Sequence, residues 1–381
     1  MTSKRSGAAP HLLLLALAAA LPRPSLLAEA TALGMNLGNV LEEPFERPPP
    51  HDAEERFFDG YSAAGFSIVR IPVRWDNHTS TAPPFTVDAA WLDRVAAVAG
   101  WATARGLRAI VNSHDDRWLD LADDGAFAAA LPRFLAIWRQ VAARFAGASP
   151  LLAFEVFNEP HLMSLASLNA MQTAVLGIVR AQHPTRAVLV CGLAFDGPWW
   201  ITSPASAGLV LPPLPDGSAD PALVLQVHDY DPFAFASPPF SIFEWGSDAD
   251  VAKARTQLAN VTAWARARRA PPAPPLPVIL GEFAVSQLQP NTTARLYWWS
   301  VMAQAARDAG FDAAIAWDDG GWFGTLNRTT AQFDKDVLHA IGLGAATSSG
   351  GAAPASAPAA AATAAAAAAC VACAAGEGGA A

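Results

Sequence analysis

Charged residues are scarce in this chain of 381 residues, since lysine, arginine, aspartate and glutamate together make up only 15% of it. Hydrophobic residues make up 52%, and this balance excludes intrinsic disorder over most of the chain. Basic residues are the rarer charged class, 25 against 34 acidic residues, which gives a formal net charge of −9. This acidic balance without a basic patch argues against nucleic acid or an anionic membrane surface as a partner.

Cysteine is also scarce, with three residues in the chain, and Cys370 and Cys373 fall in a compositionally biased tail. Such a number supports neither a disulfide framework nor a zinc site. Cys191 stands alone in an apolar run, so we expect it to be a buried core residue.

The apolar stretch near the amino terminus, residues 12–21, is too short to cross a bilayer core about 30 Å thick. Lys4 and Arg5 precede the stretch, and the small-x-small sequence at residues 28–30 follows it. Together these features predict a secretory signal peptide over residues 1–30 and no membrane anchor.

Asparagine sequons agree with a secretory route, because N-glycosylation requires one. The four Asn-x-Ser/Thr tripeptides are at Asn77, Asn260, Asn291 and Asn327. We therefore expect a secreted, extracellular glycoprotein with no stable membrane association.

The carboxyl-terminal region, residues 344–381, consists of alanine, glycine, serine, threonine and proline with few other residues, and Glu377 is its only charge. It lacks the large apolar side chains that a core needs, so we expect a disordered low-complexity tail. One folded domain is then expected over residues 31–343.

Eight short apolar runs recur between the two ends, and segments of helical period separate them. The runs cover residues 34–39, 67–73, 107–113, 152–158, 187–193, 223–228, 277–282 and 313–317. Their content of valine, isoleucine and leucine does not alternate with polar residues, which is typical of strands buried on both faces. This pattern predicts an α/β fold with a single (β/α)8 TIM barrel. A doubly wound open sheet is the alternative, but no Gly-x-Gly-x-x-Gly follows the first run.

Polar or aromatic residues follow the apolar part of nearly every run. They are Asn39, Arg70, Asn112, His114, Asn158, Glu159, His228, Tyr230, Glu282, Trp317 and Asp318. In a barrel these carboxyl ends converge on one rim, where active sites are built. The pattern therefore predicts an enzyme.

Glu159 and Glu282 end the fourth and seventh runs, and two carboxyl groups facing each other are the minimal machinery for glycoside hydrolysis. We expect Arg70 and Tyr230 to lie near Glu282, with the positive charge lowering its pKa and keeping it ionised. Exclusion of water and the field of the other carboxylate are expected to raise the pKa of Glu159 and make it the acid. His114 and His228 would supply uncharged hydrogen-bond donors.

The motifs around these residues resemble glycoside hydrolase family 5, the cellulase-like family of retaining enzymes, from about residue 34 to residue 343. They are GMNLGNVLEEP (34–44), VRIPVRW (69–75), FNEPH (157–161), HDY (228–230), LGEF (280–283) and WDDGG (317–321).

The resemblance implies a role for each matching residue. Glu159 matches the family's acid/base and Glu282 its nucleophile. Other active-site positions of the family are matched by Arg70, His114, Asn158, His228, Tyr230 and Trp317, and positions that contact sugar in some members by Asn39 and Glu42. The chain departs from many relatives at Asp115 and from some at Ser237, where they have histidine, and these positions bear on substrate range.

The resemblance implies retaining, double-displacement hydrolysis of internal β-1,4-glucosidic bonds in cellulose or related β-glucans, a reaction that needs neither a metal nor an organic cofactor. β-Mannanase, xyloglucanase and mixed-linkage glucanase activities remain alternatives, because one fold hosts them all. A non-catalytic carbohydrate-binding barrel is a further alternative, although such a protein would normally lack one of the two glutamates. The oligomeric state is left open.

Overall fold

The computed structural model describes residues 31–43, 52–114, 116–269 and 273–344 of the chain. The predicted signal peptide, the tail beyond Gly344, Asp115, Cys370 and Cys373 lie outside these described residues.

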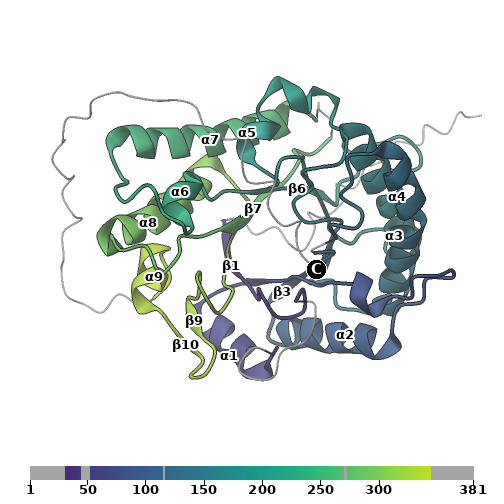
Figure 1. Ribbon diagram of the computed structural model, residues 1–381, viewed down its shortest axis with the longest axis horizontal. Coiled ribbons are helices and arrows are strands. Elements are labelled where there is room, and N and C mark those ends of the chain that lie inside the picture. Colours follow the sequence, from purple (N-terminus) through teal and green to yellow (C-terminus); the bar gives the residue numbers. More distant parts are fainter. Residues whose placement is uncertain (1–30, 44–51, 115, 270–272, 345–381) are drawn as a thin grey trace, which may run out of the picture. The chain divides into compact units, whose positions relative to one another are not determined.

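Eight parallel strands form a closed barrel in chain order, and β1 pairs with both β2 and β8 (Figure 1). The strands are β1 (Ala32–Asn36), β2 (Ile68–Ile71), β3 (Arg108–Asn112), β4 (Leu152–Glu155), β5 (Val188–Val190), β6 (Leu223–His228), β7 (Val278–Phe283) and β8 (Ala313–Ala316). Each of the eight apolar runs thus contains or overlaps a strand, and the predicted (β/α)8 barrel is confirmed. The first strand differs in position, because it begins and ends earlier than the predicted run at residues 34–39.

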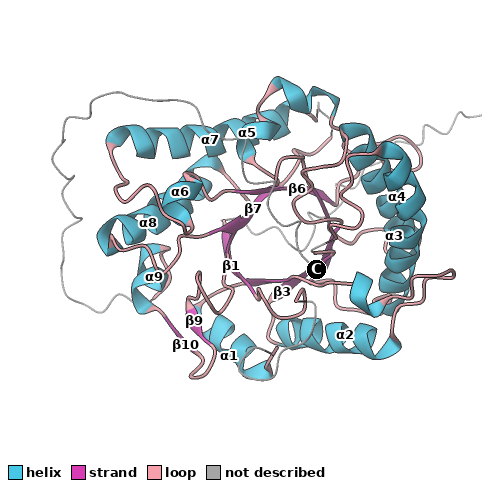
Figure 2. Cartoon of the chain, viewed as in Figure 1, coloured by secondary structure: helices cyan, strands magenta, loops and turns pink. Residues whose placement is uncertain are grey.

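Helices surround the barrel (Figure 2). The long ones are α1 (Glu55–Ala64), α2 (Ala89–Ala104), α3 (Asp124–Arg144), α4 (Leu165–Gln182), α7 (Asp248–Ala267) and α8 (Thr292–Ala309). The shorter elements are η1 (Asp76–His78), α5 (Pro198–Ile201), η2 (Pro204–Gly208), α6 (Phe233–Ala236), α9 (Lys335–Ala340) and the hairpin of β9 (Leu326–Asn327) with β10 (Gln332–Phe333).

Local sequence signals explain where the long helices begin and end. Asp88, Asp123 and Ser164 accept hydrogen bonds from the first turns of α2, α3 and α4, as N-cap residues do. Gly310 ends α8 in the left-handed conformation, with φ 76°, which glycine adopts without a steric penalty. None of the helices formed by the described residues is long and apolar enough to span a bilayer.

Two hydrophobic cores hold the barrel together. The larger one includes the residues that pack the helices against the strands, and Cys191 is buried in it, as predicted. The smaller one includes Ile68, Ile110, Ala153, Val224 and Ile315, one from each of five strands. Because side chains alternate between the two faces of a strand, the residue two positions after each of these also points into the barrel.

Candidate active site

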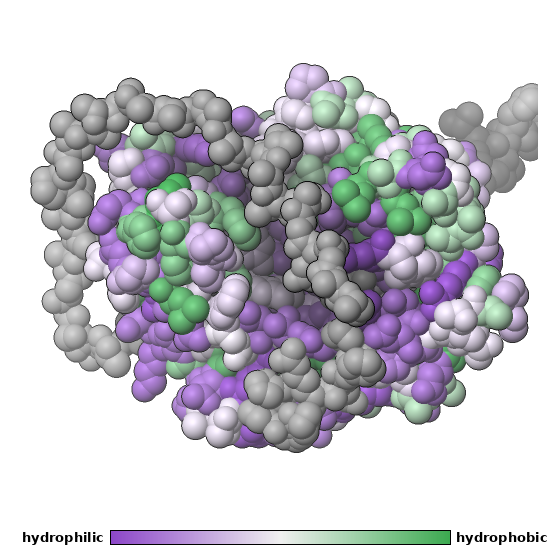
Figure 3. All heavy atoms as spheres, in the orientation of Figure 1, coloured by the Kyte–Doolittle hydropathy of each residue, from purple (hydrophilic) through white to green (hydrophobic). Residues whose placement is uncertain are grey.

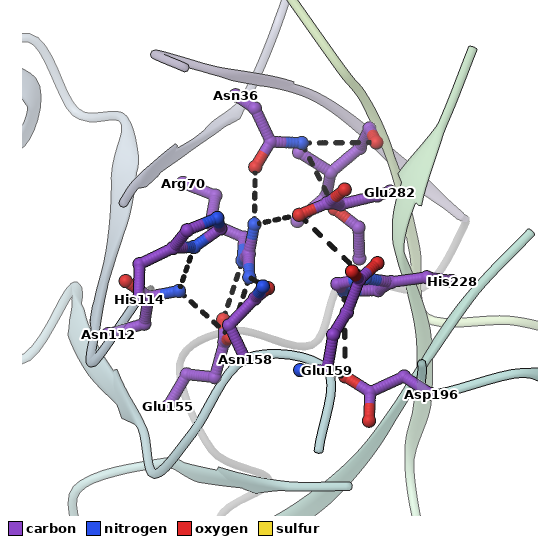
Figure 4. Close-up of polar contacts among 12 residues, drawn as sticks. Asn36, Arg70, Asn112, His114, Glu155, Asn158, Glu159, Asp196, His228 and Glu282 are labelled. Carbon is purple, nitrogen blue, oxygen red and sulfur yellow. Dashed lines mark hydrogen bonds and ion pairs between the residues drawn. The ribbon is translucent and has the colours of Figure 1, made fainter. Parts of the chain in front are cut away.

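Arg70 is the centre of a buried polar layer above the smaller core. It lies two residues after Ile68 on β2, so it points into the barrel. Its Nε and Nη2 atoms each donate to the carboxylate of Glu155 at 2.6 Å, and its Nη1 atom donates to Glu282 at 2.6 Å. Nη1 and Nη2 also donate to the side-chain oxygens of Asn36 and Asn158 (Figure 4).

This network satisfies a charge that would otherwise be costly to bury. Burial by itself would lower the pKa of Arg70, but the carboxylates of Glu155 and Glu282 raise it above the usual value. Burial likewise opposes ionisation of Glu155, and Arg70 outweighs it and lowers the pKa of that carboxyl. The Arg70–Glu155 pair is therefore a fixed, charged platform for Glu282.

Glu282 points into the barrel because the register of β7 shifts. The pairing of β6 with β7 is irregular at Val227 and His228, and that of β7 with β8 is irregular between Leu280 and Phe283. A bulge of this kind turns the following side chain to a different face of the sheet. Gly281 permits the arrangement, because a Cβ atom there would lie 2.9 Å from Nε2 of His228.

The Glu282 carboxylate is bound on both oxygens, by Arg70 on Oε1 and by the Tyr230 hydroxyl on Oε2 at 2.7 Å. Both neighbours predicted for Glu282 are thus confirmed. The predicted direction of its pKa is wrong, however: burial raises the pKa, although His228 and Arg70 oppose the effect. The sequence indicates that Arg70 lies near Glu282, but it does not reveal how completely the Glu282 carboxyl group is removed from water.

Glu159 lies in the loop after β4, in a left-handed backbone conformation with φ 50°. Its Oε1 atom lies 2.8 Å from Nδ1 of His228, and the same nitrogen lies 3.7 Å from Oε1 of Glu282. Glu159 and Glu282 each bring a carboxylate oxygen within 4.8 Å of the other. Strands far apart in the sequence therefore bring the two predicted catalytic carboxyl groups together.

Two histidines border this pair, and both are uncharged at neutral pH. Burial lowers the pKa of His228 to about 4. Burial, followed by the charge of Arg70, lowers the pKa of His114 well below its usual value. This agrees with the expectation that both supply uncharged hydrogen-bonding groups.

Asn158 belongs to the Arg70 network, and Trp317 lies beside the network against His114. Arg70 fixes the Oδ1 atom of Asn158, which leaves its amide N–H groups to donate to a ligand. The indole of Trp317 is parallel to the His114 ring within 11°, at a centroid distance of 5.9 Å. Trp317 thus offers a partly buried flat surface at the end of β8.

The two residues predicted from the loop after β1 have a different environment. Asn39 lies beyond the strand with φ 54°. Glu42 is buried and accepts hydrogen bonds from the backbone N–H groups of Asn39 and Val40, so its carboxyl group organises this loop. Sugar contact by either residue stays a prediction.

Three buried residues of the site were missed in the sequence: Asn36, Glu155 and Asp196. Asn36 accepts a hydrogen bond from Arg70 and donates one to the backbone oxygen of Gly281. It is the last residue of β1, whereas the predicted run ends at Asn39. Glu155 follows Ala153 by two residues on β4, so the period of the strand would have indicated an inward-facing carboxylate. Asp196 lies in the loop after β5, where no strand period applies.

Glu159, His228 and Glu282 are also the one group of possible metal ligands found among the described residues. Their donor atoms already have partners in Arg70, Tyr230 and one another. A cation here would have to displace the guanidinium from Glu282, so the donor set fits a hydrogen-bonded acid pair better than a metal centre.

The separation of the two carboxyl groups has a chemical meaning. Retaining glycosidases place them about 5 to 5.5 Å apart, whereas inverting enzymes leave about 6.5 to 9.5 Å for a water molecule. One carboxylate oxygen of Glu159 and one of Glu282 lie within 4.8 Å of each other, a close approach that favours the retaining over the inverting arrangement.

Comparison with known proteins agrees with this geometry. Residues 38–319 match the model of the family described as cellulase, glycosyl hydrolase family 5. The chain belongs to glycosyl hydrolase family 5. The match begins just after β1 and contains the other seven strands of the barrel.

Relatives of this family 5 chain include two bacterial proteins named as endoglucanases. Endoglucanase H of Acetivibrio thermocellus is 35% identical over 317 residues, which cover 81% of this chain and 32% of that protein. Endoglucanase B of Paenibacillus lautus is 28% identical over 340 residues, which cover 82% and 56%. The chain thus spans about a third to a half of the length of these relatives.

Solved structures include that of endoglucanase Cel5A from Thermotoga maritima, with a TM-score of 0.71, 25% identity and coverage of 81% of this chain and 96% of that one. A family 5, subfamily 4 endo-β-1,4-glucanase from Bacillus licheniformis has a TM-score of 0.70 at 27% identity, with coverage of 83% and 60%.

Proposed function

We propose that this chain is a retaining glycoside hydrolase that cleaves internal β-1,4-glucosidic bonds of cellulose or a related β-glucan. The approach of Glu159 and Glu282 within 4.8 Å carries the proposal. The names of relatives support the substrate, since one is named an endoglucanase and another, of subfamily 4, an endo-β-1,4-glucanase.

In the first step the Glu282 carboxylate attacks the anomeric carbon, and the Glu159 carboxyl group gives its proton to the departing glycosidic oxygen. A covalent glycosyl-enzyme forms on Glu282. In the second step the ionised Glu159 takes a proton from water, whose oxygen attacks the anomeric carbon and releases Glu282 with retained configuration. Arg70 and Tyr230 hold Glu282 in line for attack.

The sugar under attack would contact Asn158 and Trp317. The free amide N–H groups of Asn158 suit its 2-hydroxyl, a contact that strengthens in the oxocarbenium-like transition state. The indole of Trp317 suits the C–H face of the ring. No step of this mechanism requires a cofactor.

Five tryptophans follow or flank strand ends and are candidates for the walls of outer subsites: Trp75, Trp118, Trp199, Trp200 and Trp322. Trp118 is half-buried, and the guanidinium of Arg133 covers its ring. Trp75 and Trp200 are buried in the core and cannot serve. Trp199 and Trp322 are 54% and 55% exposed, and they follow β5 and β8. On the face drawn in Figure 3, hydrophobic residues form separate clusters and not one continuous patch.

We retain secretion as part of the proposal. Asn77, Asn260 and Asn327 are exposed, as glycan acceptors must be. Asn291 is the least suitable sequon, because its side chain caps α8 and its amide group donates to Glu244.

The test is reducing-sugar release from soluble cellulose derivatives, glucomannan and mixed-linkage glucan. Glu282→Gln and Glu159→Gln are each expected to lose at least about a hundredfold in rate, since each removes a group that takes part in bond exchange. Glu55→Gln on α1, whose side chain is 56% exposed, is the matched control and should retain the wild-type rate. Preference among the polymers decides between glucanase, mannanase and mixed-linkage activity. Lack of release from all of them by the wild type would favour the non-catalytic carbohydrate-binding alternative.

A further inference from the structure

The loop after β5 contains three consecutive non-glycine residues in the left-handed conformation. Ala194, Phe195 and Asp196 have φ angles of 58°, 61° and 57°. A non-glycine residue in this conformation is strained and persists only where its surroundings enforce it, often at functional sites. This turn therefore needs an explanation beyond chain connection.

The turn places the Asp196 side chain under the acid/base. Asp196 is fully buried, and its Oδ2 atom accepts hydrogen bonds from the backbone N–H of Glu159 at 3.3 Å and from Nε2 of Gln226 at 3.1 Å. Glu159 is itself in a left-handed conformation, so its backbone depends on such support. One carboxyl group thus fixes the main chain of the acid/base (Figure 4).

Asp196 also contacts His228, whose ring lies against the Glu159 carboxylate. Its backbone oxygen accepts from the backbone N–H of His228 at 3.0 Å, and its Oδ2 atom lies 3.9 Å from Nε2 of that ring. The opposite ring nitrogen, Nδ1, lies 2.8 Å from the Glu159 carboxylate. Asp196 therefore contacts both the backbone of Glu159 and the residue that orients its carboxyl group.

A ring stack joins the same turn to the chain that follows Glu159. The Phe195 ring stacks on His161 at a centroid distance of 4.1 Å, and the Phe195 N–H donates to the backbone oxygen of Pro160. The strained turn and the loop of Glu159 are thus coupled as one unit.

We propose that Asp196 is a positioning residue for the acid/base, and that its buried carboxyl group acts as a neutral acceptor that fixes the backbone of Glu159. Both N–H donors converge on Oδ2, as they would on the carbonyl oxygen of an un-ionised acid. Burial, with the charges of Glu159 and Glu155, raises the pKa of Asp196 well above its usual value. The Cys191 thiol is a further titratable neighbour.

This inference depends on the proposed function and is tested with two substitutions of similar size. Asp196→Asn is neutral and retains the acceptor oxygen, whereas Asp196→Leu removes it. Asp312→Leu is the matched control, because Asp312 also accepts a backbone N–H, from Val278, but at the opposite end of the barrel.

The measurement is kcat/KM on cellotriose and on dinitrophenyl β-cellobioside. This constant reports the steps up to formation of the glycosyl-enzyme and therefore does not depend on the second bond exchange. Cellotriose has a poor leaving group and needs the proton from Glu159, whereas dinitrophenolate leaves without it. We expect Asp196→Leu to lose roughly 10- to 100-fold on cellotriose and less than about threefold on the aryl substrate. Asp196→Asn should stay within about threefold of the wild type on both.

An equal loss on the two substrates, or a loss no greater than that of Asp312→Leu, would overturn the positioning role. Impairment of Asp196→Asn to the level of Asp196→Leu would overturn the neutral-acceptor role. A wild type that cleaves neither substrate would contradict the proposed function itself, and the inference with it.

Discussion

At the scale of single residues, the site depends on how a few buried charges are paired. Glu155 binds two nitrogens of Arg70, which leaves Nη1 of the guanidinium for Glu282 and Asn36. A bidentate pair of this kind fixes the orientation of the guanidinium as well as its charge. Lysine at position 70 would lose that geometry, so the motif requires arginine.

Asp229, beside His228, provides a prediction for the pH dependence of stability. Burial, followed by the charge of Asp231, raises its pKa from 3.8 to about 7, and Lys253 opposes the effect. The folded protein then binds this proton more tightly than the unfolded chain does. The resulting stabilisation is complete below the ordinary pKa and is lost as the pH rises through about 7.

Asp229→Asn removes this titration, so its stability relative to the wild type should improve as the pH rises from 4 to 8. The gain should be at most about 4 kcal/mol, at about 1.4 kcal/mol per pKa unit. Chemical denaturation of both proteins across this pH range measures the difference. Parallel curves would show that Asp229 ionises normally in the folded protein.

At the scale of elements, strand register and loop conformation decide where the functional groups point. The irregular pairing of β7 turns Glu282 inward, and left-handed residues at Glu159 and at the turn of Asp196 place the acid/base and its support. The loops after β1 and β8 also approach each other closely, because Gly38 lies against the indole of Trp317.

Gly38→Ala tests this contact between loops. The added Cβ atom would lie 2.7 Å from Cζ2 of Trp317 and 2.8 Å from the backbone oxygen of Asp318, so one of the loops must move. We expect a loss of about 1 to 3 kcal/mol in stability from overpacking. A displaced indole should lower the hydrolysis rate roughly 10- to 100-fold.

Gly100→Ala is the control for this substitution, because Gly100 lies in α2 with no atom within 4 Å of the added Cβ. It should stabilise the protein by about 0.5 to 1 kcal/mol and leave the rate unchanged. Thermal unfolding and hydrolysis assays on both variants make the comparison. If Gly38→Ala behaves like Gly100→Ala, the Trp317 platform does not depend on this close approach.

At the scale of the whole molecule, the order of strands and the two catalytic candidates could be predicted from the sequence. Buried parallel strands produce apolar runs that are visible without a structure, and their carboxyl ends meet at one rim. Glu159 and Glu282 were therefore identified although the barrel brings them together from distant parts of the chain.

The supporting residues were harder to predict, for physical reasons. The predicted end of the first strand was Asn39, whereas β1 ends at Asn36, so Asn36 was not predicted as a site residue. Glu155 was not predicted because it lies inside an apolar run. The role of Asp196 depends on three left-handed residues, which no pattern in the sequence indicates. The pKa of Glu282, which burial raises and Arg70 lowers, likewise depends on tertiary packing.

The most direct test of the account is covalent labelling of the nucleophile. A 2-deoxy-2-fluoro-cellobioside with a dinitrophenyl leaving group slows the second step of a retaining reaction and traps the glycosyl-enzyme. Mass spectrometry of the wild type should show one added fluorocellobiosyl group on the peptide that contains Glu282, and Glu282→Gln should remain unlabelled. Labelling at another residue, or turnover of cellobiosides to products of inverted configuration, would contradict the account.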